Sequence, residues 1–227
     1  MKRYALIVPT SMGVRITPTS RQPVHISHEY YMHATSAETN AATVSAALGL
    51  PVKVLTNFVE GSPIAAFIKA DLRSRNLEYE GKEVPQGDPW GYRHQFNIVD
   101  CGYGVRGPRV YNDRAGEVGQ ILNVADFDLE RIFGTEGAEI LHMSGLIAAM
   151  SRDTGEFCLQ LARAAKAYGT RISFDLNHRA SFWRDREGEL TEIFREIASV
   201  ADILTGNEED FQLCLGVKGP AAGGQGL

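Results

Sequence analysis

The chain has 227 residues, of which 44% are hydrophobic, enough to bury a core as one domain or as one domain with a small appendage. Its formal net charge is −5 and its Lys and Arg residues are scattered, which argues against a nucleic-acid-binding protein. No stretch approaches the roughly 20 apolar residues of a membrane helix, and the first residues lack a secretory signal pattern, so we expect a cytoplasmic protein without a membrane partner.

The first third of the chain alternates between strand and helix patterns. The run "RYALIV" at residues 3–8 predicts a buried strand, and residues 13–33 break into short β-favouring pieces. An alanine-rich helix follows Ser36, and "VKVLTNF" is the next predicted strand. Ser62 as N-cap and Pro63 at the first helical position predict the start of a second helix.

Residues 78–114 interrupt this alternation. The strand-like runs "YRHQFNIVD" and "RVYND" are separated by a segment with Gly and Pro, which predicts a hairpin that pairs with the strands before Ser36. The alternation then resumes with the strand "AEILHMSG", a helix over 153–168, the strand "RISFDLN", a helix over 188–200, the strand "ADILTGN" and a short last helix. Such βα units predict an α/β fold, with a parallel sheet flanked by helices.

Polar residues follow one of these strands in "FDLNHRASFW". Ligands of open parallel sheets bind beyond the carboxyl ends of the strands, so Asp175, Asn177 and Arg179 are candidate binding residues. A planar guanidinium suits a carboxylate or a phosphate, because it can donate two parallel hydrogen bonds. The structural alternative, equally compatible with the pattern, is an Arg179 that pairs with Asp175 and holds the loop.

Two further segments have polar residues at the ends of predicted strands. In "VYNDRAG", Arg114 would reach the same ligand if the irregular region is a small sheet over the site, whereas the alternative is a solvated charge at a hairpin end. In "ADILTGNEED", Asn207 can cap a helix with an acidic first turn, and a structural interpretation is sufficient there.

The sequence predicts no metal site. His25, His28 and His33 lie close together, but in a strand the side chain of His28 points away from the other two. The three cysteines are odd in number and widely spaced, which favours reduced, mostly buried thiols over a disulfide framework or a zinc site.

Taken together, five segments resemble elements of the ribokinase-like (PfkB) carbohydrate kinases, most closely the 2-keto-3-deoxygluconate kinases. The segment "TSAETNAATVSAALG" is similar to the family's "GGAEANVAVALARLG", "VYNDRAG" to "YDRAGS", and "LHMSG" to "LHLSG". In the same way, "FDLNHRASFW" is similar to "FDLNYRPxLW" and "ADILTGNEEDF" to "ADIVxxNEEEA". The order and spacing of the five agree over most of residues 1–216.

The resemblance implies a sugar kinase with an α/β core and a small β-sheet lid. The core would consist of residues 1–8, 34–77 and 117–227, and the lid of residues 9–33 and 78–116.

The resemblance also implies roles for single residues. Asn40 would contact the sugar at the hinge between lid and core, and Arg114 and Arg179 match the family's arginines that bind a sugar acid. A substrate carboxylate accounts for two guanidinium groups. Asn207 and Asp210 correspond to a family Asn-x-x-Glu near the Mg²⁺ and phosphate of ATP.

Several positions depart from the family pattern. Thr35 and Ser36 replace paired glycines, which predicts a stiffer hinge, and Thr35 can form a capping box with Glu38. Asn112 stands where the family has a tyrosine two places before its first arginine. We therefore expect that the site can bind a sugar that is related to the family's usual substrate but differs from it.

Family members continue into a Gly-Ala-Gly-Asp motif whose Asp is the catalytic base, and this sequence reaches Leu227 without one. No catalytic residue is therefore assigned, and we expect residues 1–227 alone to be inactive. The expected function is transfer of the γ-phosphoryl group of ATP, with Mg²⁺, to a 2-keto-3-deoxy sugar acid, by a protein of which this chain is an N-terminal portion. The alternatives are a noncatalytic sugar-acid-binding or dimerisation module and another PfkB kinase, such as a fructokinase or a 5-dehydro-2-deoxygluconokinase.

The lid region has apolar residues that need a covering surface, including Ile26, Tyr30, Phe96 and Ile98. This pattern and the resemblance lead us to expect a homodimer formed through the lid.

Overall fold

The computed structural model describes residues 2–219 and divides into two compact units. Unit 1 consists of Met1–Pro9 and Ile121–Leu227, and unit 2 of Thr10–Gln120. Met1 and residues 220–227, which belong to the expected core segments, lie outside the described residues.

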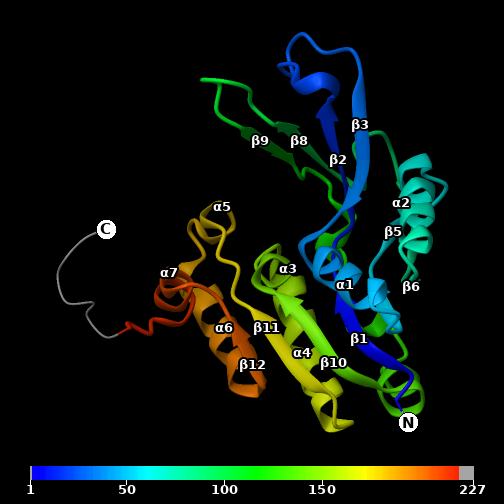
Figure 1. The fold of residues 1–227 in the computed structure, drawn as a ribbon. Coiled ribbons are helices and arrows are strands. Elements are labelled where there is room, and N and C mark those ends of the chain that lie inside the picture. Colours follow the sequence, from blue (N-terminus) through cyan, green and yellow to red (C-terminus); the bar gives the residue numbers. More distant parts are fainter. Residues whose placement is uncertain (1, 220–227) are drawn as a thin grey trace. The chain divides into compact units, whose positions relative to one another are not determined.

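Unit 1 contains four parallel strands that pair in the order β12-β11-β10-β1 (Figure 1). Their bounds are Tyr4–Pro9 for β1, Ala138–Ser144 for β10, Arg171–Asp175 for β11 and Ile203–Thr205 for β12. All four were predicted from short apolar runs, and the structure confirms them. The central residues of β11 are buried, as expected for a parallel strand covered on its faces.

The helices of unit 1 are α3 (Gly145–Ala148), α4 (Arg152–Ala167), α5 (Ala180–Trp183), α6 (Glu187–Val200) and α7 (Glu208–Asp210). Irregular helical turns cover Val124–Asp126, Glu130–Glu136 and Phe211–Leu215. The predicted helices over 153–168 and 188–200 are confirmed as α4 and α6 within one residue at each end. Ser151 begins α4 because its side chain accepts a hydrogen bond from the Thr154 amide, in a capping box.

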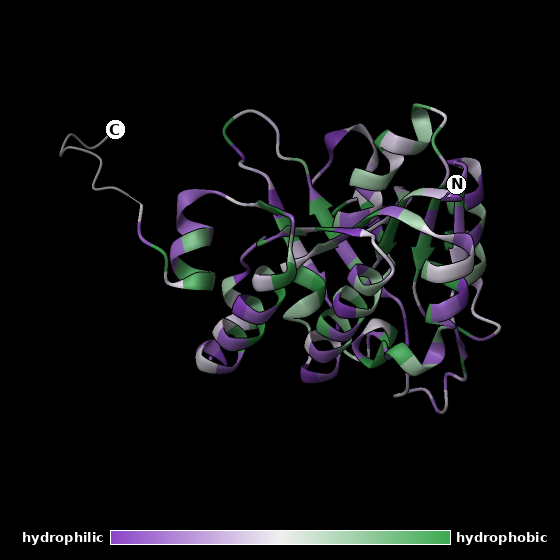
Figure 2. Cartoon of the chain, turned by 90° about the horizontal axis from the view of Figure 1, so that it is seen from below, coloured by the Kyte–Doolittle hydropathy of each residue, from purple (hydrophilic) through white to green (hydrophobic). Residues whose placement is uncertain are grey.

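The core of unit 1 lies where α4 and α6 pack against β11 and against each other. The Phe194 ring, on α6, is in edge contact with Phe174 of β11 and with Trp183 of α5, at centroid distances of 5.3 and 4.9 Å. Figure 2 shows hydrophilic and hydrophobic residues alternating along the helices, the pattern of helices with one buried side. This packing holds α5 and the loop before it against the end of β11.

Unit 2 contains a four-stranded sheet in the order β3-β2-β8-β9. The strands are β2 (Gly13–Pro18), β3 (Tyr30–Thr35), β8 (Gln95–Asp100) and β9 (Arg109–Asp113). β8 and β9 form the predicted antiparallel hairpin, and β8 pairs in parallel with β2, so the expected pairing with the strands before Ser36 is confirmed.

The rest of unit 2 is a parallel pair of strands with two helices, α1 (Ala37–Ala47) and α2 (Pro63–Ser74). The pair is formed by β4 (Val52–Leu55) and β6 (Leu77–Glu80), and a smaller parallel pair by β5 (Phe58–Val59) and β7 (Glu83–Val84). Ser62 caps α2 and Pro63 is its first residue, as predicted. β6 was not predicted, and the expected core boundary at residue 77 falls inside it.

The expected capping box of Thr35 and Glu38 is wrong. Ser36 is the N-cap of α1, and its Oγ accepts from the Thr39 amide at 3.0 Å. Thr35 cannot cap because it belongs to β3, where it pairs with Gly13. The Glu38 carboxylate instead accepts a hydrogen bond from the Thr10 hydroxyl.

The three cysteines are free thiols, with Cys158 and Cys214 buried and Cys101 exposed. Burial raises the pKa of the Cys214 thiol to about 12, which keeps it protonated. Within residues 2–219, no helix combines the length and apolar character needed to cross a bilayer.

Candidate functional site

The loop after β11 places the strongest sequence-predicted residues at the carboxyl end of that strand. Asp175 and Asn177 are half-buried and Arg179 is exposed. Asn177 has a φ of 38°, a left-handed conformation that Asn tolerates better than most residues. The Leu176 amide donates to the carbonyl oxygen of Thr205 at 2.8 Å, so the loop stays joined to the end of β12.

One carboxylate holds the loops after β11 and β12 together. Asp210 accepts from the His178 amide at 3.2 Å through Oδ1 and from the Asn207 amide at 3.0 Å through Oδ2. The Asn207 side chain accepts in return from the Asp210 amide at 2.9 Å, which closes a capping box. The structure therefore gives Asn207 and Asp210 a structural task, and their expected place near ATP stays a prediction.

Arg179 has few contacts. Its Nη1 donates to the carbonyl oxygen of the adjacent His178 at 3.0 Å, and among the described residues neither Arg179 nor Asp175 forms an ion pair. The alternative in which the two residues pair is therefore wrong. The His178 ring packs on Trp183 at a centroid distance of 5.0 Å, which fixes the backbone that carries the exposed guanidinium.

In unit 2, Arg114 is not the solvated charge that the alternative interpretation expected. Gly116 has a φ of 66°, and the turn it forms lets the Glu117 amide donate to the Arg114 carbonyl oxygen at 3.2 Å. Arg114 Nη1 lies 2.9 Å from each carboxylate oxygen of Glu117. The side chain of Arg114 is 17% exposed and that of Glu117 is fully buried.

The turn belongs to a larger group of five residues, which we call the hydroxyl–carboxylate cluster: Thr10, Ser11, Glu38, Arg114 and Glu117. The Ser11 hydroxyl donates to Glu117 at 2.5 Å, and the Thr10 hydroxyl donates to Glu38, also at 2.5 Å. The Thr10 amide donates to the Leu55 carbonyl oxygen at 2.9 Å, which places the cluster at the carboxyl end of β4. Two buried carboxylates are thus each satisfied by one of two consecutive hydroxyls, as buried charges require.

Gly119 permits this arrangement. A Cβ atom there would lie 2.0 Å from Ser11 Oγ, so any other residue would displace the hydroxyl that binds Glu117. The sequence analysis did not identify the cluster, because its residues are spread over more than a hundred positions.

Asn40 lies in the first turn of α1 and is exposed. Its amide donates to the Ser36 carbonyl oxygen at 3.2 Å, and its side chain makes no hydrogen bond to any described residue. The side chain is therefore available to a ligand.

The strand register gives the four-stranded sheet of unit 2 two different faces. Residues paired across the strands share a face, and one face is mainly apolar. Its apolar members include Ile16, Tyr30, Met32, Phe96, Ile98 and Tyr111, while Asp100, Arg109 and Asp113 lie on the same face. The opposite face has the polar residues Arg15, His33, Gln95, Asn97 and Asn112, together with Tyr31, Val99 and Val110.

The polar face contains two amide oxygens that sequence analysis missed. Gln95 and Asn97 are 2% and 8% exposed, and the Oε1 and Oδ1 atoms of these side chains have no hydrogen-bond partner in the described part of the chain. A buried acceptor without a donor is unfavourable by about 1–3 kcal/mol, so these atoms are suited to a ligand hydroxyl or to water. Only the period-two alternation of "QFN" in a strand could have indicated them.

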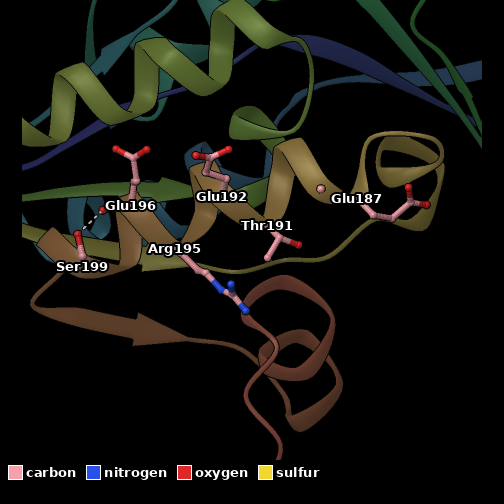
Figure 3. A pocket seen from close by; sticks show the side chains of 7 residues that line it. Glu187, Thr191, Glu192, Arg195, Glu196 and Ser199 are labelled. Carbon is pink, nitrogen blue, oxygen red and sulfur yellow. Dashed lines mark hydrogen bonds between the residues drawn. The ribbon is translucent and has the colours of Figure 1, made fainter.

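A hollow of about 810 Å³ lies along α6 and contains none of these residues. Figure 3 shows Arg195 directed from α6 toward the last helical turn, away from Glu192 and Glu196. Arg195 donates through Nε and Nη2 to the Leu215 carbonyl oxygen, at 3.0 and 2.8 Å. The guanidinium is thus engaged with the backbone, and the remaining lining includes three glutamates.

The described residues contain no group of three or more His, Cys, Asp or Glu side chains placed to hold a metal ion. Both carboxylate oxygens of Asp210 already accept backbone N–H groups. Mg²⁺ in nucleotide sites keeps several waters and is held by one or two carboxylates with substrate phosphates, so Asn207 and Asp210 would reach it through water.

No protein-family model matches the chain. Among curated proteins, 2-dehydro-3-deoxygluconokinase of Thermoproteus tenax is 23% identical over 222 residues, which cover 95% of this chain and 64% of that protein. 5-Dehydro-2-deoxygluconokinase of Clostridium perfringens is 32% identical over 96 residues, which cover 42% of this chain and 27% of that protein.

Solved structures match almost the whole chain. 2-Dehydro-3-deoxygluconokinase of Thermotoga maritima matches with a TM-score of 0.84 and 23% identity, over 95% of this chain and 63% of that one. A PfkB family carbohydrate kinase of Listeria grayi matches with a TM-score of 0.82 and 21% identity, over 96% of this chain and 65% of that one. The fold is that of the PfkB carbohydrate kinases.

An uncharacterized sugar kinase of Pyrococcus horikoshii, solved in complex with ATP, matches with a TM-score of 0.76 and 18% identity, over 94% of this chain and 67% of that one. The chain spans just under two thirds of the length of the Thermoproteus and Thermotoga proteins.

Proposed function

We propose that this chain belongs to a PfkB sugar kinase that transfers the γ-phosphoryl group of ATP to 2-keto-3-deoxygluconate, also called 2-dehydro-3-deoxygluconate. The observation that carries the proposal is Arg179, an exposed guanidinium without an acidic partner among the described residues, at the carboxyl end of β11. A guanidinium in this position binds a carboxylate bidentately, and a neutral sugar has no group that requires it.

Other residues supply hydrogen bonds to the sugar in this proposal. Asn40 and Asn177 carry amide side chains, and Asp175 accepts from hydroxyl groups. The unpartnered acceptors of Gln95 and Asn97 suit sugar hydroxyls, which are donors.

ATP is the proposed phosphoryl donor, and a cytoplasmic location is part of the same proposal. The ATP complex of the Pyrococcus sugar kinase supports this choice. Asn207 and Asp210 are the residues proposed to lie near its phosphates and Mg²⁺. When bound, the metal would neutralise phosphate charge, and these two residues hold the backbone after β12 in place.

We also propose that two copies associate through the apolar face of the four-stranded sheet. Tyr111 on this face is 65% exposed, and Met32 and Tyr30 are 37% and 38% exposed. Exposed apolar side chains that share one face of a sheet are typical of an interaction surface. Sedimentation of the chain at high concentration tests this, since a monomer would contradict it.

A second candidate is 5-dehydro-2-deoxygluconokinase. The Clostridium enzyme of that name is the more similar in local sequence, at 32% identity over 96 residues. Both candidate substrates are sugar acids, so Arg179 does not separate them. A comparison of the two acids as ligands does, because they differ in the position of the keto group. A noncatalytic sugar-acid-binding module remains the alternative from another class.

The deciding experiment is calorimetric titration of the chain with 2-keto-3-deoxygluconate and with 3-deoxyfructose, in which a hydroxymethyl group replaces the carboxylate. Arg179→Ala is expected to weaken binding of the acid by roughly tenfold to a hundredfold, since a hydrogen bond to a charged group is lost, and to affect the neutral sugar much less. Arg171→Ala is the matched control, an exposed arginine at the opposite end of β11. Equal weakening of both ligands would contradict the carboxylate assignment.

Catalysis needs a separate assay. Residues 1–227 include no assigned base, so we expect no ATP-dependent phosphorylation by them alone. A chimera that continues from Leu215 into the part of the Thermotoga enzyme outside the match is expected to phosphorylate the acid. A noncatalytic module would bind the acid but give no active chimera.

A further inference from the structure

The Arg114–Glu117 pair differs from a free guanidinium in its charge. Both carboxylate oxygens of Glu117 lie 2.9 Å from Arg114 Nη1, and the carboxylate is fully buried. The Ser11 hydroxyl donates to the same carboxylate at 2.5 Å. Arg114 and Glu117 together therefore have a net charge near zero.

The negative charge of Glu117 also acts on any anion that approaches Arg114. Water screens it little because the carboxylate is buried. An acid bound at Arg114 would be attracted by the guanidinium and repelled by a carboxylate one hydrogen bond farther away. The attraction that Arg114 gives to an acid, relative to a neutral ligand, is thus largely cancelled.

Arg179 in unit 1 has no such partner. It is exposed and forms no ion pair among the described residues, and its side chain donates one hydrogen bond, to a backbone carbonyl oxygen. The two arginines expected to share one role therefore have different electrostatic environments.

We infer that Glu117 is a positioning residue of the proposed sugar site that holds Arg114 and cancels its charge, so that the Arg114–Glu117 pair does not select for an acidic sugar. The inference rests on the proposed function. It revises the expectation that Arg114 and Arg179 both bind the substrate carboxylate. Selection for the acid then falls to Arg179.

The test measures the ratio of the dissociation constants of 3-deoxyfructose and 2-keto-3-deoxygluconate by calorimetry. The double variant Arg114→Met with Glu117→Gln removes both charges of the pair, so that neither partner is left without the other, and it is expected to fold. We expect it to keep the ratio of the unaltered chain within about twofold, because a neutral pair contributes no selection. Glu117→Gln alone removes the carboxylate that cancels the charge of Arg114 and is expected to raise the ratio by about fivefold or more.

Glu60→Gln is the matched control, since Glu60 is exposed in the same unit and its replacement removes the same charge. A tenfold fall of the ratio in the double variant would overturn the inference, because Arg114 would then contribute to selection for the acid. An unchanged ratio in Glu117→Gln would overturn it as well. If the unaltered chain bound neither ligand, the proposed function itself would fail, and the inference with it.

Discussion

The loops at the ends of β11 and β12 and the hydroxyl–carboxylate cluster both combine arginine with acidic residues, but they do so in opposite ways. In the loops, Asp210 accepts from backbone amides and Arg179 stays exposed. In the cluster, Glu117 accepts from the side chains of Ser11 and Arg114 and is fully buried. The same residue types therefore leave an accessible charge in one region and a neutralised one in the other.

The largest effect on stability is expected in the cluster. Glu117→Ala leaves Arg114 largely buried without its carboxylate, and breaking a buried pair in this way lowers the free energy of unfolding by about 3–5 kcal/mol. Urea unfolding measures the loss, with Glu60→Ala as the exposed control. A loss below about 1 kcal/mol would mean that water reaches the pair and that the two regions are alike.

A smaller effect is expected in the loops. Asp210→Ala removes the acceptor of two backbone amides and is expected to lower the free energy of unfolding by about 1–2 kcal/mol. Asp210→Asn retains one acceptor oxygen and should lose about half as much. Glu209→Ala, an exposed neighbour, is the control. Equal unfolding curves for Asp210→Ala and the unaltered chain would show that the two loops are held by other contacts.

The comparison extends to pH, because unit 2 also buries a neutral histidine. His94 is 2% exposed. Its Nδ1 lies 2.9 Å from the Met12 carbonyl oxygen, and its Nε2 accepts a hydrogen bond from the Val59 amide. These contacts suit a neutral ring that carries its proton on Nδ1. Burial lowers the pKa of His94, and the bond to Met12 opposes this shift in part. The unfolded chain therefore binds a proton near pH 6.5 that the folded chain binds only at lower pH.

The contribution of His94 to the free energy of unfolding is therefore fully present above about pH 6.5 and is lost as the pH falls toward the lowered pKa. Over this range the free energy of unfolding changes by at most about 1.4 kcal/mol per pH unit. His94→Gln should remove this part of the slope, which denaturant unfolding between pH 5 and 7.5 measures. His25→Gln, at an exposed site, should not. A slope unchanged by His94→Gln would mean that the ring titrates alike in the folded and the unfolded chain.

The smallest effect on stability is expected for Arg179→Ala. An exposed side chain with one bond to a neighbouring carbonyl should change the free energy of unfolding by no more than about 0.5 kcal/mol. Thermal unfolding of the variant measures this. A loss as large as that of Asp210→Ala would show that Arg179 holds the loop and would remove the contrast with Arg114.

Local chemistry made much of the fold predictable. The strands β1, β10, β11 and β12 are short apolar runs, and Ser62 and Pro63 mark the start of α2 as expected. β6 was missed because "LEYE" alternates in polarity and follows a helix directly, so that only its pairing with β4 identifies it as part of a parallel sheet. The cap of α1 was assigned one residue too early, since Thr35 was already needed as the last residue of β3.

The candidate site was predictable only in part. The sequence by itself determined the residue types at strand ends, because a parallel strand that ends in polar residues presents them to a ligand, and Arg179 and Asn177 follow from that rule. Only the tertiary structure decided which partner each charged side chain contacts. Glu117 reaches Ser11 across 106 positions, and Gly119 makes room for that contact. Burial and charge compensation depend on such long-range contacts, and no local pattern of residues contains them.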